Sequence, residues 1–539
     1  MTRRRAPSRT RTVPCDALVI GSGAGGAVAA LELARAGHRT VVLEEGPRTS
    51  TAEIAASAPA ENLRRLYRDA GLTPVFGSPV IPYGEGRCVG GSTVVNGGIL
   101  WAPPDALLER WARVMGTTDY RAGRLAEHVR TVSERLGVGE QPHGDGNADS
   151  RLLAGAADAL GWHWAAARRA APGCRHRNRC PTGCPSGAKR SMLVSYLPEA
   201  ERYGARIEPN TRAVLLRHDG RTVHGVTAVS GPAGLDGPGG PGGPGGPGGG
   251  PDGSSGSGGP DGSDGRTRIE YRPRTVFLAA GAVGTALLLQ RSGIHRRHAG
   301  RAMGFHVNFR LVARLADPVR ATRGTIFTAQ IREFDELGIH LMPANLTAGS
   351  LAAALAGHGP AVIDALLADL DSVLVCTVQV RMSGRVAVRQ LAGGTRLLRH
   401  HLTPYDHGLL RFALGRAARL LFRAGAVELY PPCPGVLRSD RTAQEFAARS
   451  DPRGWNLVSV HAMGSCPMGR PALGGVCDQD GRPYGFTNLR LCDASVLPGP
   501  AGISPQGTVL AFAHEIVARH LSAPPPLPLR RHGDSDTTP

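Results

Sequence analysis

Hydrophobic positions near the start of the chain follow a strand, helix, strand pattern. Residues Asp16–Ile20 form a short apolar run typical of a buried strand, and Ala24–Ala36 carries small and apolar residues at helical spacing. Thr40–Leu43 is a second apolar run. Because a single helix lies between the two runs, this order predicts a βαβ unit with both strands parallel in one sheet.

Three glycines join the first predicted strand to the helix. Gly21 permits a tight turn, Gly23 lets the backbone approach a pyrophosphate, and Gly26 allows the helix to pack closely on the strand. Glu44 ends the second strand about 20 residues beyond the glycines, where a carboxylate can accept hydrogen bonds from a ribose 2′-OH. The unit therefore predicts a dinucleotide site at a helix N-terminus, without distinguishing FAD from NAD. Three further residues of the turn belong to this predicted site: Ser22, Ala24 and Gly25.

Later segments extend the pattern. Residues 49–76 and 151–169 have helical spacing, whereas residues 206–230 and 266–276 read as strands of a sheet that sits on the nucleotide domain. Residues 276–293 return to an apolar strand, a glycine turn and a helix, so we expect them to rejoin the nucleotide domain.

Residues 301–450 have a different character, with apolar segments such as Val373–Val380, mixed helices and glycine turns. We assign them to a substrate domain, although no residue among them indicates chemistry and further core is the alternative. The expected fold class is α/β, with a Rossmann-type domain assembled from discontinuous segments and a mixed α+β substrate-binding domain. The expected division is a tail (1–14), the nucleotide domain in three parts (15–115, 201–300 and 451–520), a cap or linker region (116–200), the substrate domain (301–450) and a second tail (521–539).

Composition and charge limit the classes of function that the chain could have. The 539 residues suffice for two or three domains, and the formal net charge is +19. Lys189 is the only lysine, so nearly all basic residues are arginines in a background rich in Ala, Gly and Pro. Since no basic helix or aromatic-interleaved basic stripe is present, nucleic-acid binding is not expected. Weak peripheral contact with an anionic membrane surface remains compatible with the charge.

Targeting and spanning segments are not predicted. The arginine-rich start leads directly into the nucleotide strand, without an apolar export segment. The longest apolar run, Val276–Leu289, falls short of the about 20 residues that a bilayer requires. Ten scattered cysteines do not indicate a disulfide framework in so long a chain. We expect a soluble, cytoplasmic protein without a transmembrane segment.

Residues 231–265 consist almost wholly of Gly, Pro, Ser and Asp. They carry too little apolar surface to offset the entropy of ordering them, so this insert is predicted to be a flexible loop. Its G-P-G triplets resemble collagen, but a triple helix needs three chains and a longer run. The tails 1–14 and 521–539 are likewise expected to be disordered.

A second glycine cluster lies in residues 82–101, PYGEGRCVGGSTVVNGGILW. Its bare backbone could lie against a flat ring or a phosphate, although an ordinary turn is also compatible with it. The candidate contacts of this loop are Gly90, Gly91, Ser92, Asn96 and Gly97.

Together with the nucleotide unit, the motifs GRCVGGSTVVNGG, HAMGSCPMG and NLRLCDASVLPGPAGISPQGTVLAFAHEI resemble the glucose-methanol-choline (GMC) family of FAD-dependent oxidoreductases. The resemblance covers most of the chain. GAKRSMLVSYL and RFALGRAARLLFRAGAVELY are most similar to the long-chain alcohol oxidase branch. The resemblance implies FAD rather than NAD, hence a Rossmann-type FAD-binding domain with the flavin ring near Gly90, Gly91, Ser92 and Asn96.

The resemblance implies further cofactor contacts. Asp493 and Ala494 match the family's segment at the ribityl and pyrophosphate portion of FAD, where Asp493 can accept hydroxyl hydrogen bonds. Some relatives attach the flavin covalently through a histidine immediately before the asparagine, but this chain has Val95 there, so noncovalent FAD is expected. We also place Val214, in the strands after residue 206, among the cofactor-binding residues.

Cys174, Cys180 and Cys184 stand at C-x5-C-x3-C, followed by Pro185. The end of this run matches the end of a ferredoxin-type run, and some sugar-oxidising GMC relatives are similar in carrying an iron–sulfur cluster. The alternatives are a structural thiol-rich loop and a zinc site. Lys189 lies just beyond, which suggests that an ammonium group is needed at this place.

His461, in SVHAMGSCPMG, occupies the place of the first catalytic histidine of GMC enzymes. A lone histidine near apolar residues is more often a satisfied core group, so this role depends on the resemblance. Oxidising an alcohol requires a base for the hydroxyl proton while hydride leaves for flavin N5. Before Pro505 the family usually has Asn or His, and this chain has Ser504, which can still donate and accept one hydrogen bond.

The resulting hypothesis is an FAD-dependent oxidoreductase that oxidises a small-molecule alcohol, with His461 as base and Ser504 as hydroxyl partner. A long-chain or other hydrophobic alcohol is the candidate substrate, and oxygen, a quinone or a redox protein the candidate acceptor. The alternatives are a sterol or sugar-type dehydrogenase that uses an iron–sulfur cluster and a flavin-binding protein without turnover.

Overall fold

The computed structural model describes residues 11–117, 120, 122–140, 147–231, 267–344, 346–391 and 394–523. The helices are α1 (Ala24–Arg35), α2 (Thr51–Ala56), α3 (Pro59–Leu66), α4 (Asp105–Met115), α5 (Ala122–Leu136), α6 (Ala148–Ala159), α7 (Tyr196–Arg202), α8 (Gly281–Arg291), α9 (Ala348–Ala354), α10 (Pro360–Ala368), α11 (Pro404–Arg423), α12 (Asp440–Arg449) and α13 (Gln506–Ser522). The expected tail residues before 11, the expected insert beyond Gly231 and the expected tail after 523 lie outside the described residues.

One sheet of seven strands holds the nucleotide unit. Its strands are β1 (Arg11–Ile20), β2 (Thr40–Leu43), β8 (Arg206–Glu208), β9 (Thr211–His218), β10 (Val223–Ser230), β11 (Thr267–Leu278) and β20 (Leu489–Leu491). The order is β8-β2-β1-β11-β10-β9, and β20 also pairs with β11. Strands β8, β2, β1, β11 and β20 are parallel, whereas β10 and β9 are antiparallel additions. Parallel strands need crossovers, and α1 supplies the one between β1 and β2.

A second sheet of eleven strands extends through the other half of the molecule. Its strands are β3 (Thr73–Phe76), β4 (Ile81–Tyr83), β6 (Trp164–Ala166), β12 (Gly304–Leu315), β13 (Ala329–Ile331), β14 (Ile339–Pro343), β15 (Val373–Arg381), β16 (Arg385–Gln390), β17 (Arg396–His401), β18 (Ala426–Tyr430) and β19 (Val458–Met463). The short strands β5 (Gly139–Glu140) and β7 (Arg168–Arg169) form a separate pair.

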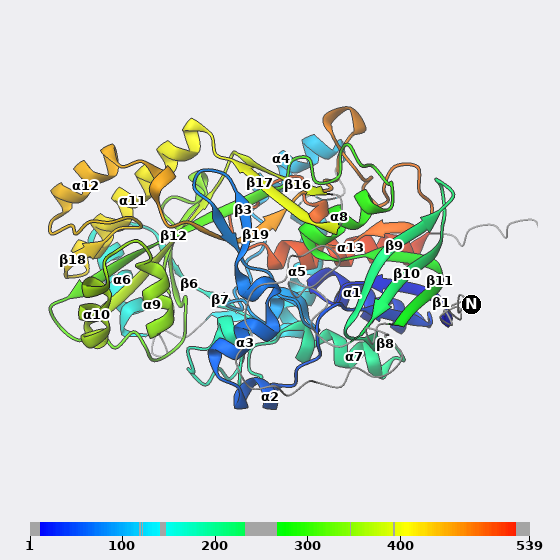
Figure 1. Cartoon of the computed structure of the whole chain (residues 1–539), viewed down its shortest axis with the longest axis horizontal. Helices are drawn as coiled ribbons and strands as arrows, with labels where there is room; N and C mark the ends of the chain where they lie inside the picture. The colour runs from blue at the N-terminus through cyan, green and yellow to red at the C-terminus, as the bar shows by residue number, and fades with distance from the viewer. Residues whose placement is uncertain are drawn as a thin grey trace, which may run out of the picture.

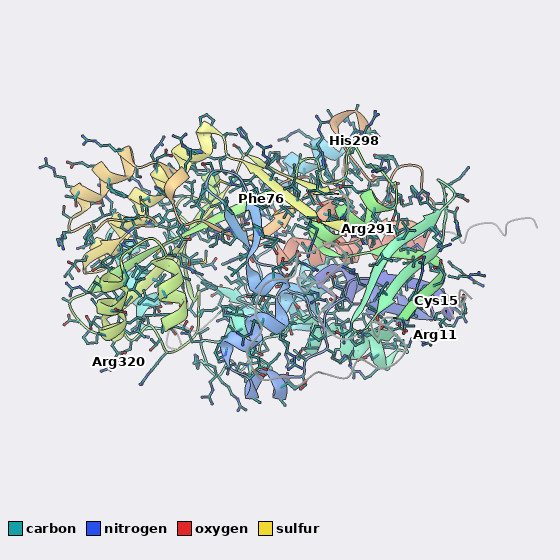
Figure 2. The ribbon with its side chains drawn as sticks, viewed as in Figure 1. Arg11, Cys15, Phe76, Arg291, His298 and Arg320 are labelled. Carbon is teal, nitrogen blue, oxygen red and sulfur yellow. The ribbon has the colours of Figure 1, made fainter. Side chains whose placement is uncertain are left out.

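The two sheets occupy opposite ends of an elongated molecule. Figure 1 shows β1, β9, β10 and β11 at one end and β12, β18 and helices α9 to α12 at the other. Arg11 and Arg320 mark the two ends in Figure 2. Helix α8 contacts both β9 and β16, so it connects the two sheets. On the nucleotide side, α1 packs against α7 and α13.

The predicted βαβ unit is confirmed, with the helix and second strand within a residue of their expected bounds. The first strand begins earlier, at Arg11, inside the expected tail, because residues 11–15 pair with Ile269–Pro273 of the long strand β11. Residues 276–293 rejoin the nucleotide sheet as expected, through the end of β11 and helix α8.

Three expected elements need correction. Residues 206–230 and 266–276 do not form a separate sheet on the nucleotide domain, because β8, β9, β10 and β11 belong to the nucleotide sheet itself. The helix expected over 49–76 is instead α2 and α3 followed by strand β3. The helix expected over 151–169 ends at Ala159, and its remainder pairs as β6 and β7, because tertiary pairing overrides local periodicity.

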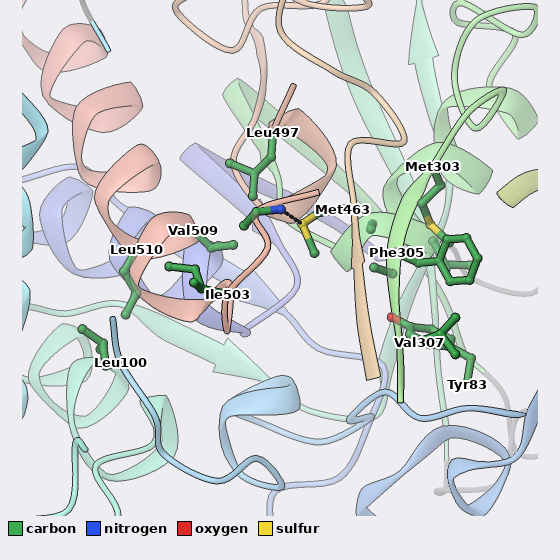
Figure 3. Packing of buried hydrophobic residues seen from close by; sticks show 14 of the residues in the cluster. Tyr83, Leu100, Met303, Phe305, Val307, Met463, Leu497, Ile503, Val509 and Leu510 are labelled. Carbon is green, nitrogen blue, oxygen red and sulfur yellow. Dashed lines mark hydrogen bonds between the residues drawn. The ribbon is translucent and has the colours of Figure 1, made fainter. Parts of the chain in front are cut away.

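The buried core runs from the nucleotide sheet to strand β19 and the loop before α13. In Figure 3, Met463 of β19 lies close to residues of the last loop, and its sulfur accepts a 3.2 Å hydrogen bond from the Ala501 N–H. Ile503 and Leu497 are buried in the same cluster. The loop before α13 is therefore held on apolar side chains, which positions the residue that follows Ile503.

Candidate functional site

A cavity of about 540 Å³ lies where the carboxyl ends of the parallel nucleotide strands face the larger sheet. Ligands in open α/β sheets bind at this edge. Most predicted site residues line it: Gly21, Gly23, Ala24, Gly25, Glu44, Gly91, Ser92, Asn96, Gly97, His461, Asp493, Ala494 and Ser504. Four predicted residues are absent from the lining: Ser22, Gly26, Gly90 and Val214.

The first glycine turn has the close packing that its sequence predicts. Gly21 has φ +100°, and a Cβ on Gly26 would lie 1.9 Å from the Gly21 carbonyl oxygen. Larger residues would therefore push α1 away from the strand. A Cβ on Gly23, at the N-cap of α1, would meet nothing within 4 Å. The open space at this helix N-terminus fits a pyrophosphate, which the backbone N–H groups can bind.

Ser22 connects the parts of the nucleotide site rather than lining the cavity. Its hydroxyl donates to Glu44 Oε2 at 2.7 Å and accepts from the Gly90 N–H at 3.0 Å. Glu44 also accepts from the Gly46 N–H at 2.9 Å, and burial raises the pKa of its carboxyl. The first turn, the acid after β2 and the second glycine loop are thus held by one set of bonds, in which Gly90 takes part through its N–H.

The second glycine loop is held from behind by the only lysine in the chain. Lys189 is 3% exposed, and its ammonium donates to the carbonyl oxygens of Val94, Asn96 and Cys180 at 2.7, 2.6 and 2.9 Å. Burial lowers the pKa of Lys189 to about 8, so it remains mostly charged at neutral pH. The Asn96 amide bonds Gln506 at the start of α13 and the Gly98 N–H. The loop is therefore fixed against the cavity.

Asp493 is largely occupied by protein donors. Its carboxylate accepts from the Gly281 N–H at 2.8 Å, the Thr285 hydroxyl at 2.6 Å and the Ser495 N–H at 2.8 Å. It lines the cavity and anchors the start of α8 there. Val214 does not line the cavity, whereas its neighbour Ala213 does. The backbone carbonyl of Val214 accepts a hydrogen bond from Arg291.

The three loop cysteines have separate partners. Cys174 lies 3.5 Å from the Thr325 hydroxyl, Cys180 accepts from Arg169 at 3.3 Å, and Cys184 contacts the Ser186 hydroxyl at 3.4 Å. Within the described residues, no group of three or more His, Cys, Asp or Glu side chains could hold a metal ion. The iron–sulfur alternative therefore finds no ligand cluster here, and the loop instead supplies the Cys180 carbonyl that Lys189 binds.

His461 lies on β19 opposite His306 of β12. The register shifts between this pair and the next one, Asn308 with Val458, which marks a bulge in β19 of the kind that re-aims side chains at sites. The two Nδ1 atoms are 3.0 Å apart. Burial lowers the pKa of His461 to about 4, with a further contribution from His340, and it holds the pKa of His306 well below its usual value.

One backbone contact determines which ring nitrogens of this histidine pair carry hydrogen. The Gly502 N–H donates to His306 Nε2 at 3.0 Å, so neutral His306 carries its hydrogen on Nδ1 and donates it to His461 Nδ1. Neutral His461 then carries its hydrogen on Nε2. In this state Nε2 of His461 is a donor, and it can accept a proton only in the other tautomer, in which the hydrogen of His461 is on Nδ1.

Ser504 lines the same cavity as His461. Within the described part of the chain its hydroxyl has no hydrogen-bond partner, so it is available to a ligand. Its neighbour Ile503 is 3% exposed and fixes the backbone at this point. The structure thus brings together the two residues for which a catalytic role was predicted, beside the glycine loops.

The polar face of the larger sheet was not predicted from the sequence. This face lines the cavity opposite the nucleotide loops with Asn308, Arg310, Gln330, His340, Thr377 and Gln379. Pairing puts Asn308 beside Gln379, Arg310 beside Thr377, and His340 beside Gln379. One signal was available: in residues 306–311 polar and apolar residues alternate, the period of a strand with one distinctive face.

Comparison with known proteins identifies the class to which this fold and site belong. Family models described as "GMC oxidoreductase" match residues 63–235 and 384–513, and a model described as "FAD binding domain" matches residues 16–64. An uncharacterised GMC-type oxidoreductase of Mycobacterium tuberculosis is 33% identical over 94% of this chain and 75% of its own. The chain belongs to the GMC oxidoreductase family, and its glycine turn and Glu44 fit the FAD that this family model implies.

More distant relatives and solved structures are also similar to this chain over most of its length. A long-chain-alcohol oxidase of Arabidopsis thaliana is 24% identical over 95% of this chain and 67% of its own. The crystal structure of pyridoxine 4-oxidase from Mesorbium loti is similar with a TM-score of 0.68 at 17% identity, over 94% of this chain and 99% of that one. The structure of formate oxidase is similar with a TM-score of 0.68 at 14% identity, over 94% of this chain and 98% of that one. These structures share the fold. Among the described helices, none has the length and apolar character needed to cross a membrane.

Proposed function

We propose that this oxidoreductase oxidises an alcohol to the corresponding carbonyl compound, with His461 and Ser504 binding the reacting hydroxyl. The observation that supports this most is that both side chains line one cavity with the glycine turn and the Asn96 loop. Bound FAD would supply a hydride acceptor at N5. The similarity to a long-chain-alcohol oxidase favours an alcohol as donor.

We assign the hydroxyl proton to His461. In the resting pair its Nε2–H donates to the substrate oxygen, while the Ser504 hydroxyl accepts or donates a second bond. Proton removal therefore requires the other tautomer of each ring. In that state neutral His461 carries its hydrogen on Nδ1 and donates it to His306 Nδ1, while neutral His306 carries its hydrogen on Nε2 and no longer accepts from the Gly502 N–H. The hydroxyl proton then goes to the free Nε2 of His461. Leaving the buried Gly502 N–H without an acceptor costs about 1–3 kcal/mol, which is small beside the barriers of such reactions.

The same proposal covers the cofactor and the domains. Noncovalent FAD would leave the protein on acid precipitation, since Val95 offers no nucleophile beside Asn96. Residues 301–450 would supply the wall that binds substrate, and residues 15–115, 201–300 and 451–520 would hold FAD.

An anaerobic panel of alcohols tests the proposal. Purified protein is mixed with primary, secondary, sterol and sugar alcohols, and bleaching of the flavin absorbance is followed. We expect bleaching by at least one class, followed by recovery when oxygen, a quinone or a redox protein is added, which also identifies the acceptor. If no alcohol bleaches the flavin, the protein is better described as a flavin-binding protein without turnover.

A further inference from the structure

Arg310 is the one arginine of the cavity lining that has no protein partner in the described part of the chain. It lies in the middle of β12, and its neighbour across the sheet is Thr377. Other lining arginines are engaged: Arg68 binds Glu45 and Glu85, and Arg291 binds the Val214 carbonyl and Gln390. Arg310 forms no hydrogen bond or ion pair with any described residue.

The surroundings of Arg310 do not neutralise its charge. Burial alone lowers its pKa, without a contribution from any carboxylate. The acidic residues of the lining belong to the nucleotide side, where Glu44 binds Ser22 and Asp493 binds Thr285. Arg310 is half-buried, and a partly desolvated guanidinium with no counter-ion is less favourable than one paired with an anion. A ligand that supplies the missing negative charge would remove this cost.

Asn308 is a second polar side chain of this wall without a protein partner among the described residues. It is 6% exposed, lines the cavity between Arg310 and the histidine pair, and its amide has no hydrogen-bond partner among the described residues. His306, Asn308 and Arg310 alternate along β12 and so lie on one face. Unpaired donors therefore extend along the wall from the reacting position toward the far end of the cavity.

We propose that Arg310 binds the carboxylate of the substrate, so that the enzyme acts on hydroxy acids whose carboxylate lies several carbons from the oxidised hydroxyl carbon. This rests on the proposed alcohol oxidation and names its substrate class. A planar guanidinium matches a carboxylate through two parallel hydrogen bonds. The carboxylate takes no part in the redox step, in which the hydroxyl carbon loses hydride and the oxygen loses its proton.

The spacing along the strand favours hydroxy acids longer than 2-hydroxy acids. At about 3.3 Å per residue along a strand, the Cα of Arg310 lies roughly 13 Å from the Cα of His306, which stands opposite His461. Side chains of a strand stand roughly perpendicular to the sheet, so the guanidinium and the imidazole remain about as far apart as their Cα atoms, which exceeds the separation of hydroxyl and carboxylate in a 2-hydroxy acid. Straight-chain ω-hydroxy acids of intermediate length have the required separation.

The first test needs no turnover. Oxidised holoenzyme is titrated with straight-chain monocarboxylic acids, and binding is measured from the perturbation of the flavin spectrum. We expect affinity that increases with chain length and falls on the order of 10- to 100-fold in Arg310→Gln, the effect of losing charge-assisted hydrogen bonds. Arg310→Lys should recover part of it. Arg314→Gln, on the same strand but paired with Glu428, is the matched control and should bind like the parent.

The second test compares substrates. The parent should reduce its flavin with ω-hydroxy acids at higher kcat/KM than with n-alcohols of equal length, and Arg310→Gln should lose that preference mainly through KM. Arg310→Met should keep or raise the Tm of ligand-free holoenzyme, because it removes an unpaired, half-buried charge, whereas replacing a structural arginine would lower the Tm.

Equal carboxylate affinity in parent and Arg310→Gln overturns the inference, as does equally strong binding of inorganic phosphate or chloride. If no alcohol is oxidised yet carboxylates bind through Arg310, the carboxylate site stands, whereas the proposed alcohol oxidation and the hydroxy-acid substrate that rests on it both fail.

Discussion

At the scale of single residues, the hydroxyl partners of the proposed reaction differ in what they contribute. His461→Ala should slow flavin reduction by on the order of 10²- to 10⁴-fold with FAD retained, because it removes the proton-handling group. Ser504→Ala removes one neutral hydrogen bond, so its effect should be near tenfold. Stopped-flow reduction with a fixed alcohol measures both. A His461→Ala variant that reduces its flavin as fast as the parent would show that another group takes the proton.

Burial of His461 sets the pH range of its activity. Its pKa is lowered from the usual 6.5 to about 4, so the imidazole is neutral at every pH well above 4. The rate of flavin reduction should therefore be nearly constant between about pH 8 and pH 5 and fall only as pH approaches 4. The stability gained by keeping this group neutral is complete above pH 6.5 and decreases as pH falls toward 4. A rate profile that bends near pH 6.5 and loses this bend in His461→Ala would contradict the expected pKa.

The sequence indicated the glycine loops and His461, whereas it did not indicate the polar wall that they face. The glycines, Glu44 and His461 carry recognisable spacing or a family motif, because chemistry constrains both residue type and position. Arg310 and Asn308 come from a strand whose partners, β15 and β19, lie far away in the chain. Which face of such a strand meets a cavity is decided by pairing over long sequence separation, and local periodicity cannot specify it.

At the scale of elements, the loop that carries Asn96 depends on Lys189. Lys189→Met would leave the carbonyl oxygens of Val94, Asn96 and Cys180 without their ammonium donor in a buried place. We expect the Kd for FAD to rise by on the order of tenfold, together with a lower Tm. Flavin fluorescence on titration of the apoprotein gives the Kd.

Two variants give this test its contrast. Arg190→Met alters the exposed neighbour and should leave the Kd for FAD unchanged. Lys189→Arg keeps the charge but spreads its donors over a larger planar group, so it should be intermediate. Normal FAD affinity in Lys189→Met would mean that the loop keeps its conformation without the ammonium.

The cysteine spacing illustrates the limit of a local motif. Cys174, Cys180 and Cys184 match part of a cluster-binding run, yet each thiol has its own protein partner. Ligand spacing along the chain is necessary for a metal site, but convergence of the side chains in space decides it.

At the scale of the whole molecule, residues 231–265 join two strands that are already paired. Ser230 of β10 lies opposite Thr267 of β11, so their ends are close enough for a short hairpin turn. Replacing residues 231–265 by such a turn should leave FAD content and flavin reduction within about twofold of the parent, because shortening a loop reduces its closure entropy. Loss of FAD from the shortened protein would show that the insert contributes to the nucleotide site.

Chemical modification of Lys189 can be used to measure local opening of the protein. As the only side-chain amine in the sequence, it is the single lysine that an amine-reactive reagent can modify, and at 3% exposure the folded protein shields it. Its acylation rate therefore measures how often the second glycine loop opens, since modification requires release of the three carbonyl oxygens that Lys189 binds. One mass measurement over time would follow that opening with FAD bound and with FAD removed.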